Sequence, residues 1–171
     1  VARVDGMVVF VYGSVPGDTS RVRVTKTRKN YLEAETTEVV VPSDLRTTPR
    51  CRHFGTCGGC KWQHVQYKAQ LDFKRQHVVD ALERIGGFKG VQVNPTLGAE
   101  EIYYYRNKME FSFGDRWLSK EEMGTKTQNP VPAEVQESFA LGLHIPDRFD
   151  KVLDIEECWL QSDKSTNILN S

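Results

Sequence analysis

The sequence Cys51-Arg-His-Phe-Gly-Thr-Cys57-Gly-Gly-Cys60-Lys-Trp-Gln63-His64 holds three of the four cysteines of this 171-residue chain. The fourth, Cys158, lies far downstream in the sequence. A C-x₂-C pair lets two sulfurs bind one metal centre from a tight turn, and the two glycines between the cysteines permit such a turn. Cys51, in the preceding loop, adds a third ligand. With the remote Cys158 the pattern is three ligands plus one. We predict one metal site that ties two distant parts of the chain together, with the ligands Cys51, Cys57, Cys60 and Cys158.

The three-plus-one spacing favours an iron–sulfur centre over zinc. Structural zinc is usually bound by two C-x₂-C pairs, or by C-x₂-C with an H-x₃-H pair, whereas the fourth thiolate of an iron–sulfur site often comes from elsewhere. Other interpretations stay open: two disulfides, a redox pair at Cys57 and Cys60, or zinc ligation by His53 and His64. We interpret His64 as a polar anchor at the start of the following helix.

The composition is that of a soluble globular protein, with 27% charged and 39% hydrophobic residues. No apolar run reaches the length of a membrane span and no signal peptide is evident, so we expect a cytoplasmic protein without membrane association. The chain starts at Val1 rather than Met, and we expect it to be part of a longer protein. Residues 1–90 hold fifteen Lys and Arg against nine Asp and Glu, and residues 91–171 hold eight against fourteen. The basic half is compatible with nucleic-acid binding or with an ordinary solvated surface.

Residues 1–45 read as several short strands separated by glycine turns. Residues 7–12 are apolar and β-branched, and residues 21–27 alternate strictly, which places Val22 and Val24 toward a core. Further strands are predicted at 31–34 and 38–41. This pattern predicts a small OB-like barrel, a fold that often binds single-stranded nucleic acid, although a purely structural barrel with a polar outer face is the alternative. The basic residues available for RNA binding are Arg21, Arg23, Lys26, Arg28 and Lys29, and the first four are the predicted RNA contacts.

The middle of the chain predicts a long helix, followed by an antiparallel sheet. Residues 64–86 carry apolar side chains at helical spacing, and Gly86-Gly87 ends the pattern. The members of this apolar stripe are Tyr67, Leu71, Val78, Leu82 and Ile85. Residues 103–113 alternate as a strand that could pair antiparallel with 139–144. Residues 115–137 lack a clear period and are predicted to be a long loop.

These elements predict an α+β protein. Its parts are a small N-terminal OB-like β-barrel, a metal-binding loop, a long helix and a mixed α/β central domain with an antiparallel sheet. The expected domains are residues 1–45, 46–90 and 91–171, with Cys158 returning from the central domain to the metal site.

Taken together, these segments resemble the RNA uracil-5 methyltransferase family, which makes 5-methyluridine in ribosomal and transfer RNA. Asp5-Gly-Met-Val-Val-Phe-Val with Val15-Pro-Gly-Asp18 resembles the family's N-terminal TRAM domain. The family's cluster loop and following helix are matched by Cys57-Gly-Gly-Cys60, Gln63-His64, Tyr67 and Gln70-Leu-x-x-Lys74. Its central domain is matched by Tyr105-Arg-Asn-Lys-Met-Glu-Phe, Leu141-Gly-Leu-His144 and Asp150-x-Val-Leu-Asp-Ile-Glu-Glu-Cys158.

The resemblance implies a [4Fe-4S] cluster on the four cysteines and an RNA partner, 23S ribosomal RNA first and tRNA second. It also implies that Arg106 and Lys108 face RNA, the alternative for Arg106 being an ion pair with Glu110 or Glu101. The first strand of the TRAM domain is expected to precede residue 1, so the barrel would be truncated at its start.

The resemblance further implies an S-adenosylmethionine-dependent enzyme whose C-terminal catalytic domain is absent from this chain. The family's chemistry needs a free nucleophilic cysteine, and all four cysteines here are assigned to metal. No glycine-rich strand–turn–helix is present to bind the methyl donor. We therefore expect no catalytic residue here and no methyltransferase activity from these 171 residues alone. The rival interpretation is a stand-alone zinc- or cluster-stabilised RNA-binding module.

Overall fold

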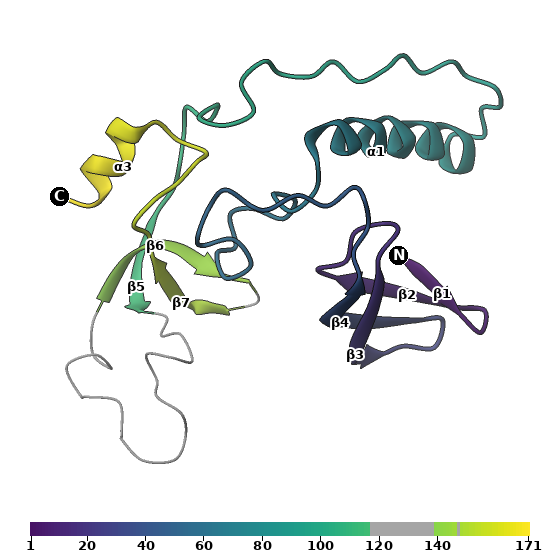
Figure 1. Ribbon diagram of the computed structural model, residues 1–171, viewed down its shortest axis with the longest axis horizontal. Coiled ribbons are helices and arrows are strands. Elements are labelled where there is room, and N and C mark those ends of the chain that lie inside the picture. The colour runs from purple at the N-terminus through teal and green to yellow at the C-terminus, as the bar shows by residue number, and fades with distance from the viewer. Residues whose placement is uncertain (117–138, 147) are drawn as a thin grey trace. The chain divides into compact units, whose positions relative to one another are not determined.

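The computed structural model describes residues 1–116, 139–146 and 148–171 of the chain (Figure 1). These residues form two compact units. Unit 1 comprises residues 1–48 and 64–98, and unit 2 comprises residues 49–63 and 99–171. Both units contain strands and helix, which confirms the predicted α+β class. The predicted domain boundaries stay predictions, and the predicted loop at 115–137 lies almost wholly outside the described residues.

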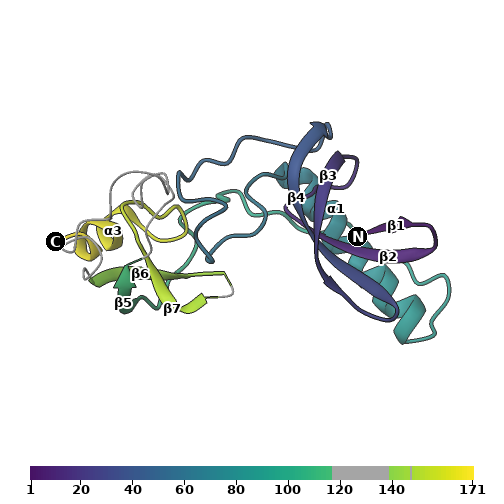
Figure 2. The ribbon, with the colours of Figure 1, turned by 90° about the horizontal axis from the view of Figure 1, so that it is seen from below.

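Unit 1 contains one four-stranded sheet with the strand order β1-β2-β4-β3 (Figure 2). Its strands are β1 Ala2–Val4, β2 Met7–Tyr12, β3 Thr19–Thr27 and β4 Tyr31–Val41. β2 and β4 run parallel, and the other two pairs are antiparallel. The strand predicted at 7–12 is confirmed, and the two strands predicted at 31–34 and 38–41 are one continuous strand. The OB-like barrel remains a prediction, since the described strands form a four-stranded sheet.

The prediction that Val22 and Val24 face a core is wrong. These side chains are 40% and 49% exposed, whereas Val9 and Ala34, on the two central strands, are buried. β3 lies at the edge of the sheet, pairs only with β4, and has three register shifts along its length. Alternation fixes the face on which a side chain lies, but burial also needs something to cover that face.

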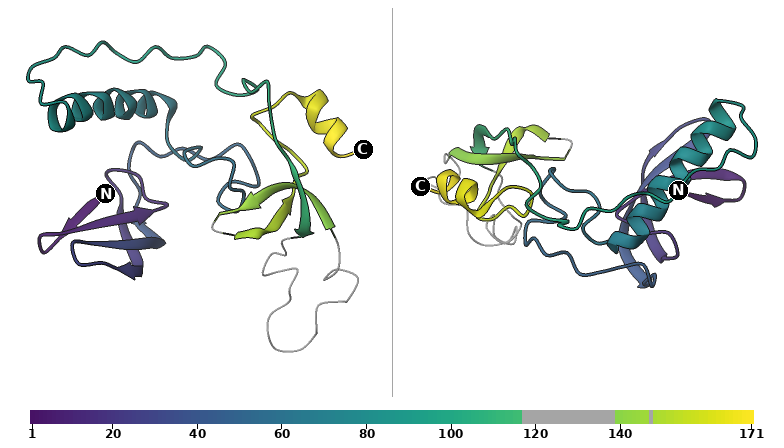
Figure 3. Two further views of the ribbon diagram at one scale, coloured as in Figure 1. Left: turned by 180° about the vertical axis from the view of Figure 1, so that it is seen from behind. Right: turned by 90° about the horizontal axis from the view of Figure 1, so that it is seen from above.

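The core of unit 1 forms where the turn after β2 meets the start of the helix. Val15, Val65 and Ala69 are buried together, and Leu45 and Phe73 pack against them. The helix is α1 Tyr67–Asp80, and it continues as a π-helical turn, η1 Ala81–Ile85 (Figure 3). The prediction of a helix at 64–86 is confirmed, with the helix starting three residues later. No helix among the described residues has both the length and the apolar character needed to cross a bilayer.

The carboxylate of Asp18 holds the loop after β2 to the segment after β4 by hydrogen bonds. It accepts hydrogen bonds from the backbone N–H of Val15 at 2.6 Å and of Ser43 at 2.9 Å. The Arg46 guanidinium donates to it at 2.7 Å and 2.6 Å, and also to the Gly13 carbonyl oxygen at 3.0 Å. The hydrogen bond from Arg46 is the main reason that the pKa of Asp18 falls to about 2, against the opposing effect of burial. Asp18 therefore joins three segments through one buried charge.

Unit 2 contains a second sheet, in which each of three strands pairs with both of the others (Figure 3). The elements are β5 Ser112–Arg116, β6 Phe139–Ile145, β7 Arg148–Asp154 and the helix α3 Asp163–Leu169. β5–β6 and β6–β7 are antiparallel, and β5–β7 is parallel, so the sheet is mixed. Its core contains the fully buried Val152 together with Ala140, Ile155 and Leu160.

The strand predicted at 103–113 forms only at its end, because β5 starts at Ser112. Upstream, the backbone N–H of Tyr104 donates to the Trp159 carbonyl at 2.8 Å, and that of Arg106 donates to the Leu160 carbonyl at 2.9 Å. Tyr104 also has a φ of 55°, which a strand does not allow. The antiparallel pairing with the 139–144 segment is confirmed for residues 112–115.

Replacing Asp18 with Asn should destabilise unit 1 by about 2 kcal/mol, the free energy that corresponds to the lowering of its pKa. Because the folded pKa of about 2 lies below the ordinary aspartate value of 3.8, this stabilisation is complete above about pH 4 and is lost as the pH falls through about 2. Hydrogen exchange of the amides in β2 and β4 would measure it.

The matched control is Glu38→Gln, which removes a carboxylate from the exposed ion pair with Arg21 in the same unit. It should change the exchange free energy by less than about 1 kcal/mol. Equal effects of the two substitutions would contradict a fastening role for Asp18.

Candidate metal centre

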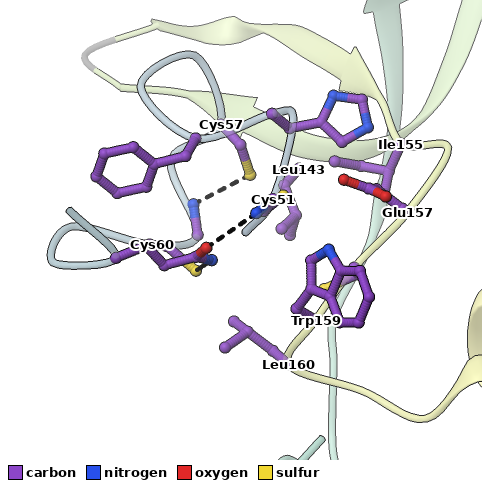
Figure 4. Close-up of a pocket in the computed structure, with 13 residues that line it drawn as sticks. Cys51, Cys57, Cys60, Leu143, Ile155, Glu157, Trp159 and Leu160 are labelled. Carbon is purple, nitrogen blue, oxygen red and sulfur yellow. Dashed lines mark hydrogen bonds between the residues drawn. The ribbon is translucent and has the colours of Figure 1, made fainter. Parts of the chain in front are cut away.

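All four cysteines line one cavity of unit 2 and are free thiols (Figure 4). Cys51, Cys57 and Cys60 come from the loop that begins unit 2, and Cys158 follows β7. The other lining residues are His53, Phe54, Gly59, Gln63, Leu143, Ile155, Glu157, Trp159 and Leu160. The structure therefore brings the four predicted metal ligands to one place, although they are about a hundred residues apart in the chain.

The two glycines of the Cys57-Gly-Gly-Cys60 loop are needed for close packing against β6. Gly58 donates its N–H to the His144 carbonyl at 3.1 Å, and a Cβ on Gly58 would lie 2.6 Å from that same oxygen. A Cβ on Gly59 would lie 2.9 Å from Leu143 Cδ1. Neither glycine has a positive φ. The sequence predicts glycine here for its backbone freedom, but the structure gives steric clearance as the reason.

Three polar contacts hold the cysteine loop to the segment that carries Cys158. The Arg52 N–H donates to Glu157 Oε1 at 2.8 Å, and the Arg52 guanidinium donates to Glu156 Oε2 at 2.5 Å. The Glu156 N–H donates to His53 Nε2 at 3.2 Å. Because this nitrogen already accepts a backbone hydrogen bond, His53 serves as a structural acceptor. The pKa of His53 is lowered, chiefly by burial, which keeps the ring neutral for this role.

N–H groups of the cysteine loop donate hydrogen bonds to its sulfurs, including one from the His53 backbone to Cys51. The Gly59 N–H donates to Cys57 Sγ, and the Gln63 side-chain amide donates to Cys60 Sγ, each at 3.3 Å. The Gln63 oxygen accepts from the Cys51 N–H at 3.2 Å, so one amide links two of the cysteines. Sequence reasoning assigned no role to Gln63. Its position three residues after Cys60 was the available signal.

The thiols of Cys51 and Cys57 are held in their protonated form in the absence of metal. Burial is the first cause that raises the pKa of each, and the neighbouring cysteines add to it. Since metals bind thiolates, loading this cavity must release protons. Within the described residues, no three Cys, His, Asp or Glu side chains converge closely enough to hold a single metal ion.

Four of the six predicted RNA contacts are engaged in exposed ion pairs. In unit 1 the β3 cations face the β4 carboxylates in a ladder, Arg21–Glu38 at 2.6 Å, Arg23–Glu35, and Lys26–Glu33 at 3.0 Å. In unit 2, Lys108 pairs with Glu110 at 2.7 Å, while the Arg106 guanidinium contacts Met109 Sδ at 3.9 Å. Arg28, at the end of β3, forms no ion pair with a described residue. RNA binding by these six residues stays a prediction.

Comparison with known proteins matches residues 1–37 to the TRAM domain. An RNA methyltransferase of Porphyromonas gingivalis is 44% identical over 169 residues, which is 98% of this chain and 36% of the relative. An RNA methyltransferase of Chlorobaculum tepidum is 44% identical over 97% of this chain and 34% of its own length. The chain thus spans about a third of the length of these curated relatives.

A solved structure is also similar, that of the Pyrococcus abyssi tRNA (uracil-54, C5)-methyltransferase in complex with S-adenosyl-L-homocysteine. The sequence identity is 26%, and the TM-score is 0.48. The match covers 95% of this chain and 30% of that chain.

Replacing Gly58 with Ala should destabilise unit 2 by about 1–3 kcal/mol, because the new Cβ meets a backbone carbonyl that cannot rotate away. Chemical denaturation followed by tryptophan fluorescence would measure the loss, since Trp62 and Trp159 both belong to unit 2. Thr56→Ala, at an exposed site of the same loop, is the matched control and should cost less than about 0.5 kcal/mol. A Gly58→Ala protein as stable as this control would contradict the steric role.

Proposed function

This chain contains a TRAM domain and is a relative of RNA methyltransferases, and from this premise we propose that it is the RNA-recognition and [4Fe-4S]-binding region of an S-adenosylmethionine-dependent RNA (uracil-5-)-methyltransferase. The observation that carries the proposal is the cavity shared by Cys51, Cys57, Cys60 and Cys158. The uracil specificity rests on the sequence motifs around these cysteines and around Arg106.

The arrangement of the sulfurs favours a cluster over a single zinc ion. Zinc requires its four sulfurs to lie about 2.3 Å from one point. In a four-iron cluster each cysteine binds a different iron, so the sulfurs surround an extended body. Here the four cysteines line a common cavity, and they come as three that are close in sequence and one that is remote. A donor set of four sulfurs around a cavity suits the cluster.

The protein groups around the cavity would position the cluster and exclude water. Gly59 N–H and the Gln63 amide already point at sulfur, and such hydrogen bonds stabilise thiolate ligands and tune the potential of a cluster. The apolar walls come from Leu143, Ile155 and Leu160. With four protein ligands, every iron would be saturated, so the cluster would stabilise the junction between the loop and the segment after β7 rather than bind substrate.

RNA would reach unit 1 through the basic edge strand β3. Its cations already pair with glutamates, so a phosphate must replace a carboxylate. Exposed ion pairs contribute only about 0.2–1 kcal/mol, and the phosphates of an RNA strand can compete with them. We propose ribosomal RNA as the substrate, with tRNA as the alternative. We place methyl transfer outside these 171 residues, since all four cysteines belong to the cavity.

Anaerobic purification of the chain, followed by iron, sulfide and zinc analysis, tests the proposal. About four irons and four sulfides per chain are expected, with a broad visible absorbance. Cys158→Ser should abolish most of this absorbance and iron content, because it removes the ligand supplied from outside the loop.

The matched control is Thr56→Ala, which alters an exposed side chain of the same loop that is not a ligand in the proposal. It should retain about four irons. One zinc per chain without sulfide would overturn the cluster and favour a zinc-stabilised RNA-binding module. Loss of iron in the Thr56 variant, with retention in the Cys158 variant, would overturn the ligand assignment.

A further inference from the structure

Trp159, which lines the cysteine cavity, also carries a stacked guanidinium. Figure 4 shows its indole beside the cavity, and Arg50 Cζ lies 3.7 Å from the centre of its ring. At this distance the guanidinium is in direct cation–π contact with the indole. Arg50 itself is exposed, so the stack ends in solvent.

Two tyrosines lie beside Trp159 with their rings inclined to the indole plane, Tyr103 at 66° and Tyr104 at 46°. Arg50 Cζ lies 5.2 Å from the ring centre of Tyr103, and the ring centres of Tyr103 and Tyr104 lie 6.1 Å and 5.3 Å from that of Trp159. The hydrogen bond from Tyr104 N–H to the Trp159 carbonyl holds the two segments together. Tyr104 is 39% exposed and Tyr105 is 57% exposed. An exposed aromatic surface therefore surrounds a charged guanidinium.

The charge on Arg50 is not neutralised by an ion pair with any described residue. Arg52, two residues later, is paired with Glu156 and Glu157, and Arg21, Arg23 and Lys26 are paired with glutamates. The segment 49–63 contains three Lys or Arg and no Asp or Glu. The acidic groups near the aromatic cluster are Asp163 and Glu157, which act on Tyr104. Arg50 thus combines a stacking face with an available positive charge.

We propose that Arg50, Tyr104 and Trp159 form a platform on which an unpaired base of single-stranded RNA stacks. The proposal rests on the proposed RNA-binding function and adds a specific site to it. Aromatic rings and arginine guanidinium planes are the surfaces on which proteins stack unpaired RNA bases. Bases inside a duplex are already stacked on one another and cannot use such a platform.

The platform depends on the metal-binding loop. Arg50 directly precedes Cys51, and Trp159 directly follows Cys158, so the contact that brings the cysteines together also brings the guanidinium onto the indole. Loss of a metal ligand should therefore weaken RNA stacking as well as metal binding. The proposed cluster would thus affect RNA recognition by positioning Arg50 and Trp159, and no reaction at iron is needed.

A photocrosslinking and binding experiment tests the platform. The probe is a short single-stranded oligouridylate that contains one 5-iodouridine, mixed with the anaerobically purified chain. Irradiation should crosslink the probe to the peptides that carry Tyr103–Tyr105 or Trp159, as mapped by mass spectrometry. Arg50→Ala should weaken binding of the same probe about tenfold, the effect of losing one stacked base. The duplex of the same sequence should compete poorly.

Two further variants separate stacking from charge. Arg50→Lys keeps the charge but lacks the planar guanidinium, so it should recover only a small part of the lost affinity. Lys61→Ala removes an exposed charge from the same loop and should weaken binding only about twofold, in a salt-dependent way. Iron content of each variant confirms that the loop is intact.

The possible outcomes distinguish this site from the broader function. If the unaltered chain binds no single-stranded RNA, the proposed function fails, and the platform fails with it. If the chain binds RNA but Arg50→Ala binds equally well, or the crosslinks map only to unit 1, the platform is overturned and the proposed function stands. Full rescue by Arg50→Lys would reduce the site to a simple phosphate contact and overturn base stacking.

Discussion

Unit 2 depends on the attachment of the cysteine loop to the segment that follows β7. The attachment is made by two backbone N–H groups, those of Arg52 and Glu156, which find acceptors on Glu157 and His53. These two hydrogen bonds join the loop to the segment after β7. The four thiols and Ile155 then line one cavity. The steric clearance at Gly58 permits the same approach on the β6 side. Without this attachment, Cys158 would not join the other three cysteines, and Trp159 would not contact Arg50.

Unit 1 contains carboxylates in two settings, and burial decides which of them stabilises the fold. The carboxylate of Asp18 is buried and accepts four hydrogen bonds, so its charge strongly favours the folded state. The carboxylates of β4 lie in exposed pairs with β3, where solvent weakens the attraction. The first arrangement stabilises the fold. The second contributes little to stability, because each exposed pair is worth only about 0.2–1 kcal/mol.

The sequence predicted the features that arise from local pattern. The strand at 7–12 and the long helix have signals within a short window, and they are where expected. The strand predicted at 103–113 failed because the backbone of Tyr104 and Arg106 pairs with residues 159 and 160, which no local pattern reveals. The exposure of Val22 depends on whether another part of the fold covers its face of the sheet, which alternation along one strand does not reveal. Local propensity thus found the elements, and long-range contacts decided their use.

The raised pKa values of Cys51 and Cys57 connect the metal site to folding. A cavity that holds its thiols protonated resists the introduction of negative charge, so the folded chain does not repel itself before metal arrives. In the proposed function, metal would replace the protons and supply the positive charge that burial requires. The bound centre would also fix residues 51 and 158 relative to each other, and with them their neighbours Arg50 and Trp159. A metal centre with no open coordination position can therefore still control recognition, because it sets the geometry of the side chains on either side of its ligands.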